Sequence, residues 1–375
     1  MFDYYIGVMS GTSVDAVDAV LCQIDQAGQV KHLDTVSAAF PAQLTKRLHH
    51  AMSVEVTDLV SYKALEGDYS HHVIKAVKQL LTQTSLSPKH ICAIGCHGQT
   101  LWHYPPSVAA ATGSPFSLQL INAALIAWHC RINVISDFRQ KDIVAGGEGA
   151  PLVPAFHYHA LAQVCPPHTV ILNLGGIANM TYLGTNAAQV IGFDSGPANT
   201  LLDAYFRHQW GAPGYDKQGK KAAMGNSIER LLKQLLRDPY FYQSPPKSTG
   251  REYFNLSWLQ QNLDGNESPQ DVLRTLVNLT AESIYQALDF LPQVPAMLVA
   301  CGGGVRNPLL MQAISHRIAP LELHTTSAFD IDPQAVEAIA FAWLAWCYEH
   351  KKPGNLPAAT GARSPVILGN KTYAG

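Results

Sequence analysis

Charge is scarce in this sequence, and no part of the chain concentrates it. Only 14% of the 375 residues are charged, the formal net charge is -2, and no block of Lys or Arg occurs. Surfaces that bind nucleic acid or anionic membranes need clustered positive charge, so neither partner is predicted. A small-molecule ligand is the partner that this composition favours.

Long apolar runs and ordered cysteine pairs are also missing. The longest apolar stretches, such as residues 335–347, are too short and too interrupted to span a bilayer, and the first residues lack the pattern of a signal peptide. The seven cysteines are scattered, and no Cys-x-x-Cys or His-x-x-x-His pair has the spacing of metal ligands. We expect a cytoplasmic protein with reduced, buried thiols. A zinc site is the alternative that this spacing disfavours.

Apolar residues, in contrast, make up 47% of the chain, and 375 residues exceed what one hydrophobic core usually serves. Strand patterns alternate with helical ones along the sequence, which is typical of an α/β fold. We predict an N-terminal domain over residues 1–135, completed by the C-terminal segment from about 350. A C-terminal domain over 136–350 would follow it.

Three glycine turns come directly after predicted strands. Glycine lets backbone N–H groups approach phosphate oxygens closely, and neighbouring hydroxyls add donors. The Gly-x-x-x-x-Gly-Lys-Ser/Thr loop is absent, so a nucleotide would be held by such turns instead. Each turn taken alone could equally be an ordinary hairpin. The predicted phosphate-binding residues are Ser10, Gly11, Thr12 and Ser13 in the first turn, Gly175 and Gly176 in the second, and Gly302, Gly303 and Gly304 in the third.

Carboxylates beside these turns are candidates for the chemistry of phosphoryl transfer, which needs a base and a way to neutralise phosphate charge. Asp194 follows the predicted strand 189–193 on a turn that leads into a helix, and we predict that it is the base. Its alternative role is to cap that helix. Asp15 and Asp18 could face a metal ion or stabilise the first hairpin.

Polar side chains also gather where two further strands end. His97 and Gln99 follow the predicted strand 91–96, and Asp137 and Arg139 follow strand 132–135. The carboxyl ends of strands in α/β sheets are where ligands bind, and Arg139 could hold a carboxylate with two hydrogen bonds.

Two more segments bear on this site. Glu337, in the first turn of the last predicted helix, is a candidate for the same site or a solvated acid at a helix start. Residues 245–250 predict an exposed loop, because they combine two prolines with Ser, Thr and Gly.

Over essentially its whole length the sequence resembles the anhydro-N-acetylmuramic acid kinases. The resemblance is carried by residues 7–18, 97–100, 137–139, 149–152, 173–179, 192–199, 248–255, 301–307 and 333–338. Ala16 and Ala198 stand where the family motifs lead us to expect glycine. We expect their methyl groups to strain turns that would otherwise use glycine.

The resemblance implies a two-domain actin-like ATPase fold, ribonuclease H-like in each domain, with a cleft between the domains. It implies a magnesium- and ATP-dependent kinase that adds water to 1,6-anhydro-N-acetylmuramic acid, opens the anhydro ring and forms N-acetylmuramic acid 6-phosphate. Such an enzyme would serve murein recycling and amino-sugar catabolism, and family members look dimeric, so a homodimer is expected.

Roles for individual residues follow from the same resemblance. Asp194 would activate the water and Glu337 would orient it, while Asp15 would face magnesium. The sugar would contact His97, Gln99, Asp137 and Arg139. The nucleotide would contact the three turns together with Val14, Asp15, Ala16, Val17, Asp18, Asn173 and Asn307.

Two other functions remain open from the sequence alone. A kinase of an ordinary amino-sugar hydroxyl would keep the same fold and nucleotide site and differ in its substrate. A non-catalytic nucleotide-dependent switch would keep the nucleotide site but would not need the polar residues at the strand ends.

Overall fold

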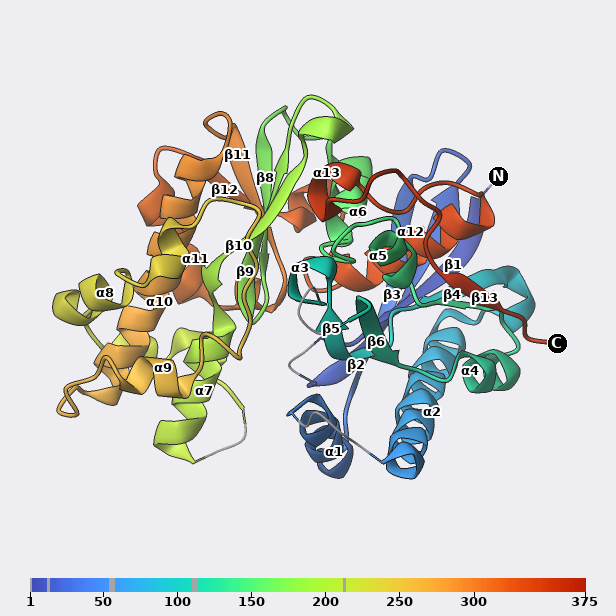
Figure 1. Ribbon diagram of the computed structural model, residues 1–375, viewed down its shortest axis with the longest axis horizontal. Coiled ribbons are helices and arrows are strands. Elements are labelled where there is room, and N and C mark those ends of the chain that lie inside the picture. The colour runs from blue at the N-terminus through green and yellow to red at the C-terminus, as the bar shows by residue number, and fades with distance from the viewer. Residues whose placement is uncertain (1, 12–13, 54–57, 110–112, 212–213) are drawn as a thin grey trace. The chain divides into compact units, whose positions relative to one another are not determined.

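The computed structural model describes residues 2–11, 14–53, 58–109, 113–211 and 214–375 (Figure 1). The chain forms two compact units: Met1–Ala160 together with Ala335–Gly375, called unit 1, and Leu161–Gln334, called unit 2. These divisions differ from the predicted boundaries at 135/136 and about 350. Residues 136–160 follow a strand that is hydrogen-bonded into the first sheet, and the helix that begins at Val336 packs on that same sheet.

Unit 1 is built on a six-stranded sheet with the strand order β13-β7-β4-β1-β2-β3. The first three strands along the chain form an antiparallel meander, whereas β4 pairs in parallel with β1, and β7 in parallel with β4. A separate two-stranded sheet pairs β5 with β6. The strands are β1 (Phe2–Met9), β2 (Ala16–Asp25), β3 (Val30–Ala39), β4 (Ile91–Cys96), β5 (Gln99–Tyr104), β6 (Phe116–Leu120), β7 (Val134–Ser136) and β13 (Asn370–Thr372).

Two long helices cover opposite faces of this sheet. Successive residues of a strand point to opposite faces. Ile6 and Val8 join the core that contains α2 (Leu59–Thr84), whereas Gly7 between them lies against α12 (Val336–Glu349). Figure 1 shows α12 lying along the strands of unit 1 although it comes from the other end of the chain.

Glycines in the sheet let α12 approach the strands at backbone distance. A Cβ added at Gly7 would lie 1.8 Å from the carbonyl oxygen of Ala338, and one added at Gly95 would lie 2.0 Å from that of Phe341. The shorter helices of unit 1 are α1 (Ala42–Ser53), α3 (Pro106–Ala109), α4 (Ala123–Cys130), α5 (Gln140–Val144), α6 (Val153–Leu161, which ends at the unit boundary) and α13 (Pro357–Thr360).

Unit 2 contains a five-stranded sheet with the order β10-β9-β8-β11-β12. Its strands are β8 (Thr169–Leu174), β9 (Ile177–Leu183), β10 (Ile191–Pro197), β11 (Met297–Cys301) and β12 (Glu322–Thr325). Its helices are α7 (Asn199–Trp210), α8 (Glu229–Leu235), α9 (Leu256–Gln260), α10 (Pro269–Ala287) and α11 (Pro308–Ile318). Apolar residues recur every three to four positions along α10 and form one face of the helix. This face packs against the strands in the core of unit 2.

The two main sheets share one topology. In each unit an antiparallel meander of three strands is extended, on the side of its first strand, by two strands parallel to that first strand. This arrangement is the ribonuclease H-like sheet, and its repetition in two units confirms the predicted actin-like α/β fold.

Helices long and apolar enough to cross a membrane do not occur in the described part of the chain.

Candidate active site

The first glycine turn joins β1 to β2, and two of its predicted residues, Thr12 and Ser13, lie outside the described residues. The backbone N–H of Val14 donates to the carbonyl of Gly11 at 3.1 Å, which closes the turn. Val14 is fully buried at φ 57°, a conformation that is rare for a β-branched side chain. The hydroxyl of Ser10 is buried and lies 2.9 Å from the Tyr69 hydroxyl of α2, so α2 holds the start of the turn.

The two alanines at expected glycine positions do not occupy the left-handed region that favours glycine. Ala198 has φ −118°, and Ala16 lies in β2, paired with Ala39 of β3, without a positive φ. Neither alanine therefore stands at a positive φ, and the expected strain from their methyl groups stays a prediction. Asp15, between Val14 and Ala16, is exposed, so its carboxylate is accessible to a cation.

The second and third glycine turns lie side by side in unit 2, because β8 and β11 pair in parallel with Asn173 opposite Cys301. A Cβ on Gly302, which has φ 85°, would come 2.3 Å from Asn173 Oδ1. Gly176 and Gly303 are exposed, and a Cβ on Gly303 would meet nothing within 4 Å. The two turns thus offer adjacent stretches of accessible backbone from one edge of the sheet.

One asparagine side chain binds the second turn, and another caps the helix that follows the third turn. Asn199, at the start of α7, donates from Nδ2 to the carbonyls of Gly175 at 2.7 Å and Leu174 at 3.2 Å. Asn307 Oδ1 accepts the backbone N–H of Leu310 at 3.2 Å and so caps α11. The predicted contact of Asn307 with a nucleotide stays a prediction, and the structure gives its side-chain oxygen a role within the fold.

Asp194 lies inside β10, not on the turn after a strand as the sequence predicted. The pairing with β9 shifts register between Asp194 and Gly196, and such β-bulges re-aim side chains near functional sites. Its carboxylate accepts hydrogen bonds from Asn179 Nδ2 at 2.8 Å and from the backbone N–H of Thr249 at 2.9 Å. The alternative role as cap of α7 is excluded, because these partners lie in β9 and in a later loop.

Burial raises the pKa of Asp194 above its ordinary value, and the hydrogen bonds from Asn179 and Thr249 oppose that rise. A general base works best when its pKa approaches the working pH, so a raised carboxyl pKa suits the predicted role. The Tyr240 hydroxyl donates to the backbone carbonyl of Asp194 at 2.8 Å and fixes the strand at this point.

Residues 245–250 form the predicted exposed loop only in part, because Pro246 and Ser248 are exposed whereas Lys247 is buried. The loop packs on Asp194, whose backbone N–H donates to the carbonyl of Lys247 at 3.1 Å. Lys247 is only 8% exposed, and its ammonium donates to the Tyr240 carbonyl at 3.2 Å and lies over the rings of Tyr240 and Phe290. Lysine carries an apolar stem, which lets this loop bury a charged residue against aromatic rings.

Lys247 is a functional candidate that sequence reasoning missed. Burial lowers the pKa of its ammonium to about 8, while attraction to Asp194 opposes that change. The same attraction lowers the pKa of Asp194. In the sequence, Lys247 stands directly before residues 248–255, which carry part of the family resemblance. That position alone gave no reason to place the lysine beside Asp194.

We expect Lys247→Met to shift the acid limb of the pH–rate profile to higher pH. Asp194 must be ionised to accept a proton, so the rate falls as the pH drops through its pKa. Loss of the neighbouring positive charge raises that pKa further and moves the limb upward. The measurement is kcat/KM for the sugar between pH 4 and 9, with Lys247→Arg as the variant that keeps the charge. A limb that stays in place in Lys247→Met would show that the ammonium does not act on Asp194.

In unit 1 the structure brings His97, Arg139 and Glu337 together. Arg139 donates from Nε to His97 Nε2 at 3.1 Å and from Nη1 to the carbonyl of Gly149 at 2.8 Å. Burial lowers the pKa of Arg139 to about 10, although the negative charges of Glu337, in the first turn of α12, and of Asp142 oppose that change. Arg139 thus remains protonated at neutral pH, beside the carboxylate of Glu337.

The hydrogen bonds of His97 define its tautomer. Nδ1 lies 2.8 Å from the Gly98 carbonyl, which can only accept, so Nδ1 carries the hydrogen and Nε2 accepts from Arg139. Burial and the charge of Arg139 hold the pKa of His97 well below its ordinary value. Both ring nitrogens therefore have protein partners, and His97 orients the guanidinium. Its predicted contact with a sugar stays a prediction.

Asp142 of α5 supports the loop that carries Gly149. This fully buried carboxylate accepts the backbone N–H of Gly149 at 2.8 Å, Asn355 Nδ2 at 2.6 Å and the Thr360 hydroxyl at 2.8 Å. The C-terminal segment of the chain is thereby tied to the loop that accepts a hydrogen bond from Arg139. Sequence reasoning did not single out Asp142, because its two side-chain partners lie more than two hundred residues away.

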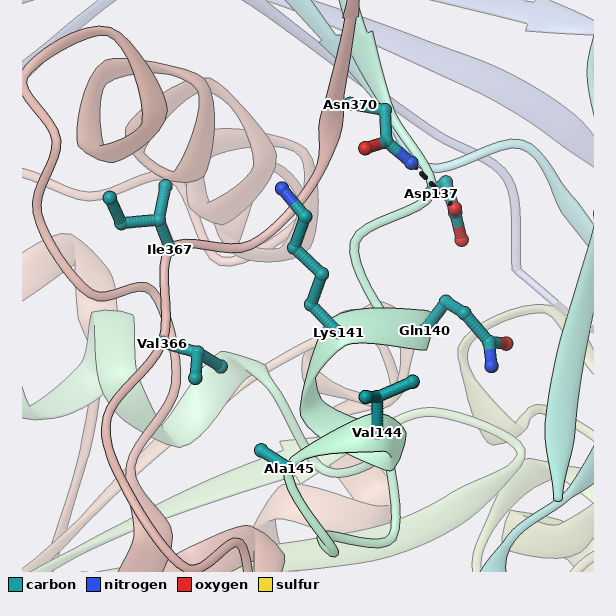
Figure 2. A pocket seen from close by; sticks show the side chains of 8 residues that line it. All are labelled: Asp137, Gln140, Lys141, Val144, Ala145, Val366, Ile367 and Asn370. Carbon is teal, nitrogen blue, oxygen red and sulfur yellow. Dashed lines mark hydrogen bonds between the residues drawn. The ribbon is translucent and has the colours of Figure 1, made fainter.

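Gln99 and Asp137, the other two predicted sugar contacts, have different surroundings. Gln99 is fully buried, and its Oε1 has no hydrogen-bond partner among the described residues. Figure 2 shows Asp137 in an open pocket of about 530 Å³, where it accepts a hydrogen bond from Asn370 Nδ2 at 2.9 Å. The residues lining this pocket include neither His97 nor Arg139, so the predicted set is divided between two surroundings.

The two-stranded sheet β5–β6 adds polar side chains that sequence reasoning missed. His103 Nδ1 lies 2.9 Å from the Ser117 hydroxyl, which also accepts from Gln119 Nε2 at 2.7 Å. Burial and the charge of Arg139 lower the pKa of His103 to about 4, so the ring is neutral. These residues extend the polar surroundings of Arg139. Sequence reasoning missed them because their strands alternate polar and apolar residues and lack the continuous apolar run of β4.

Repeated ribonuclease H-like sheets, each with a glycine turn between its first two strands, define the actin-like class of ATPases and sugar kinases. Residues 3–374 match the family model described as anhydro-N-acetylmuramic acid kinase. The chain belongs to this family.

Curated relatives extend over nearly the same length. A protein of Idiomarina loihiensis named anhydro-N-acetylmuramic acid kinase is 49% identical, with 99% of each chain covered. One of the same name from Neisseria meningitidis is 42% identical, with 98% of each chain covered. Among solved structures, the Acidaminococcus fermentans (R)-2-hydroxyglutaryl-CoA dehydratase component A aligns with a TM-score of 0.48 at 10% identity, covering 91% of this chain and 96% of the other. The family is shown by the family model and the sequence relatives.

Proposed function

We propose that this kinase converts 1,6-anhydro-N-acetylmuramic acid, ATP and water to N-acetylmuramic acid 6-phosphate and ADP. The observation that carries this proposal is the match of residues 3–374 to the anhydro-N-acetylmuramic acid kinase family. Relatives of that name at 42% and 49% identity support it. The reaction would return cell-wall sugar to amino-sugar metabolism.

The substrate explains why the enzyme needs a base for water. O6 of the anhydro sugar is part of an ether and carries no proton, so it cannot be deprotonated as in an ordinary sugar kinase. Water forms a bond to C1, the C1–O6 bond breaks, and O6 takes the γ-phosphoryl group as its bond to the β-phosphate oxygen breaks. Asp194 receives the proton that the water loses.

The glycine turns supply the nucleotide site in this proposal. Exposed backbone at Gly176 and Gly303 offers N–H donors without a Cβ in the way, and Gly11 of the first turn would add another. Magnesium, when bound, neutralises phosphate charge, and the exposed carboxylate of Asp15 suits a hard cation that keeps most of its other ligands as water and phosphate.

Arg139 and its neighbours supply the sugar site. The guanidinium is held by His97 and Gly149 and retains further N–H donors that can hold a carboxylate, such as the lactyl carboxylate of the muramic acid. Gln99 Oε1, buried without a partner among the described residues, can accept a hydrogen bond from a sugar.

We expect Arg139→Met to raise KM for the anhydro sugar about 10- to 100-fold, because a hydrogen bond to a charged group contributes about 1.5–3 kcal/mol. KM for ATP should change little. Initial rates with each substrate varied in turn measure both constants, and Arg131→Met, which removes an exposed arginine of the same unit, is the control. An unchanged sugar KM would remove Arg139 from the sugar site.

The proposed reaction is tested by incubating the protein with magnesium, ATP and 1,6-anhydro-N-acetylmuramic acid in H₂¹⁸O. The expected product is heavier than the sugar by one water and one phosphoryl group, with the label at C1. N-acetylmuramic acid and N-acetylglucosamine serve as competing substrates. Turnover of one of these alone would indicate a kinase of an ordinary hydroxyl, and sugar-independent ATP binding without turnover would indicate a nucleotide switch.

We also propose that the enzyme acts in the cytoplasm, where ATP is available, and that it forms a homodimer as its resemblance to the family implies. Sedimentation of the purified protein at micromolar concentration measures the second point, and a monomeric mass would contradict it.

A further inference from the structure

The two-stranded sheet β5–β6 turns a polar face away from the core of unit 1. Leu120 belongs to that core, and successive residues of a strand point to opposite faces, so Ser117 and Gln119 lie on the other face of β6. Thr100 and His103 of β5 are paired with Gln119 and Ser117 and complete this polar face. Ser117 and Gln119 are nevertheless buried, so neighbouring groups must satisfy most of their hydrogen bonds.

Gln119 lies beside the residues that hold Arg139. A Cβ added at Gly98 would lie 3.1 Å from the Cβ of Gln119, so these two residues pack together. The Gly98 carbonyl accepts from His97 Nδ1, and His97 Nε2 accepts from Arg139 Nε. The amide of Gln119 and the guanidinium proposed to bind the sugar carboxylate therefore belong to the same part of unit 1.

A directional chain of hydrogen bonds starts at His103. A hydrogen bond with the backbone of Glu148 raises the pKa of His103, and the Glu148 N–H already donates to the Thr360 carbonyl at 2.7 Å. The Glu148 carbonyl is therefore the partner, and the ring must donate to it. His103 Nδ1 lies 2.9 Å from the Ser117 hydroxyl, so Nε2 carries the hydrogen and Nδ1 accepts from Ser117.

This chain determines which way the Gln119 amide points. Because the Ser117 hydroxyl gives its hydrogen to His103, its oxygen can accept from Gln119 Nε2 at 2.7 Å. The same amide nitrogen donates to Thr100 Oγ1 at 3.3 Å, which uses its second hydrogen. Gln119 Oε1 has no hydrogen-bond partner among the described residues, but it is accessible to solvent. It is a fixed oxygen that can only accept.

The anhydro sugar offers two donors close to its carboxylate. The lactyl ether is attached at C3, with the acetamido group at C2 on one side and the hydroxyl at C4 on the other. The acetamido N–H can only donate, so it complements an oxygen that can only accept. The C4 hydroxyl can donate or accept, and a fixed acceptor would distinguish it poorly from other groups.

We propose that Gln119 determines the specificity of the sugar site, because its Oε1 accepts a hydrogen bond from the acetamido N–H at C2. Ser117 and Thr100 hold the amide nitrogen and so keep the oxygen toward the ligand. The enzyme then requires an N-acylated amino sugar and not only a sugar with a carboxylate. This inference rests on the proposed function, whose substrate it deepens.

The test compares wild-type protein and Gln119→Met with three sugars. These are 1,6-anhydro-N-acetylmuramic acid, its analogue with an acetyl ester at C2 in place of the acetamide, and its 4-deoxy analogue. The ester keeps the shape and the carbonyl but lacks the N–H. We expect the ester to lower kcat/KM about 3- to 10-fold in the wild type, the worth of one neutral hydrogen bond, and to have no effect in Gln119→Met. The 4-deoxy analogue should change kcat/KM by the same factor in both proteins, and KM for ATP should not change.

Ser117→Ala is the second variant, since it removes the oxygen that holds the amide nitrogen. We expect it to weaken the preference for the acetamide while thermal unfolding shows a folded protein. A wild-type protein that uses the ester as well as the acetamide would overturn the inference, even if Gln119→Met did not fold. An undiminished preference in Gln119→Met would also overturn it, as would a 4-deoxy effect that disappears in this variant. If the wild type turned over none of the three sugars, the proposed function would fail and this inference with it.

Discussion

Asp194→Asn should lower kcat for the anhydro sugar by about 10²- to 10⁴-fold, the range that general-base catalysis contributes. Asparagine nearly keeps the shape of aspartate, but it cannot take a proton at neutral pH. Its one oxygen can accept only one of the hydrogen bonds from Asn179 Nδ2 and the Thr249 backbone N–H, because these reach different oxygens of the carboxylate. The raised pKa of Asp194 predicts in addition that wild-type activity falls on acidification before an ordinary carboxylate would be protonated. Steady-state rates and a pH–rate profile measure both effects.

The matched control is Asp271→Asn in the same unit. The carboxylate of Asp271 accepts the backbone N–H of Asn226 at 2.6 Å at the start of α10, so it is also a hydrogen-bonded acid. We expect its replacement to reduce stability slightly and to leave kcat unchanged. If Asp194→Asn retained wild-type turnover while the protein remained folded, another group would have to be the base.

Gly95→Ala should lower the free energy of unfolding of unit 1 by about 3 kcal/mol or more, at the upper end of the cost of overpacking a core. The added Cβ would lie 2.0 Å from the carbonyl oxygen of Phe341 and 3.0 Å from the Cβ of Ala345, both in α12. A backbone carbonyl cannot turn away as a flexible side chain can, so the helix itself must shift. Urea unfolding followed by circular dichroism measures the loss.

Gly67→Ala is the control for this substitution. Gly67 lies inside α2, and a Cβ there would meet nothing within 4 Å. Alanine in a helix interior is more favourable than glycine by about 0.5–1 kcal/mol, so this variant should gain stability. Equal unfolding midpoints for the two variants would mean that α12 is not fixed at the strands as described.

The local sequence pattern predicted the positions of the glycine turns better than it predicted the residues that pack around them. Strand 91–96 has the predicted bounds, and the glycine turns after β8 and β11 lie where the sequence placed them. These features are local, because a strand pattern followed by glycine determines both the element and its end. Strands β5 and β12 were not predicted, because β5 (QTLWHY) is largely polar and β12 has only four residues.

The surroundings of the candidate base depend on contacts that no local pattern contains. The bulge that holds Asp194 within β10 comes from its register with β9, and the loop residues that pack on it follow more than fifty positions later. A Pro-rich polar stretch normally predicts exposure, and burial of Lys247 depends on aromatic partners elsewhere in unit 2. The sequence therefore singled out Asp194 as the candidate base but not the groups that set its pKa.

His97 illustrates the same limit in unit 1. A histidine at a strand end predicted a ligand contact, but its neighbour Gly98 and the distant Arg139 occupy both ring nitrogens. Which nitrogen carries the hydrogen depends on these partners, and therefore on the packing of β4 against the segment after β7. Residue type alone could not show whether His97 would contact a sugar or would orient the side chain of Arg139.

Unit 1 is built from two segments that are far apart in the sequence, and this has a consequence for the newly synthesised protein. Unit 2 is one continuous segment, whereas the sheet of unit 1 lacks α12 and β13 until the last forty or so residues leave the ribosome. Gly7 and Gly95 have no side chains to cover the face of the sheet that α12 contacts. The sheet is therefore uncovered at these two positions until α12 packs on it. We expect unit 2 to become protease-resistant first on stalled ribosomes, and unit 1 to depend on release of the completed chain or on a chaperone until then.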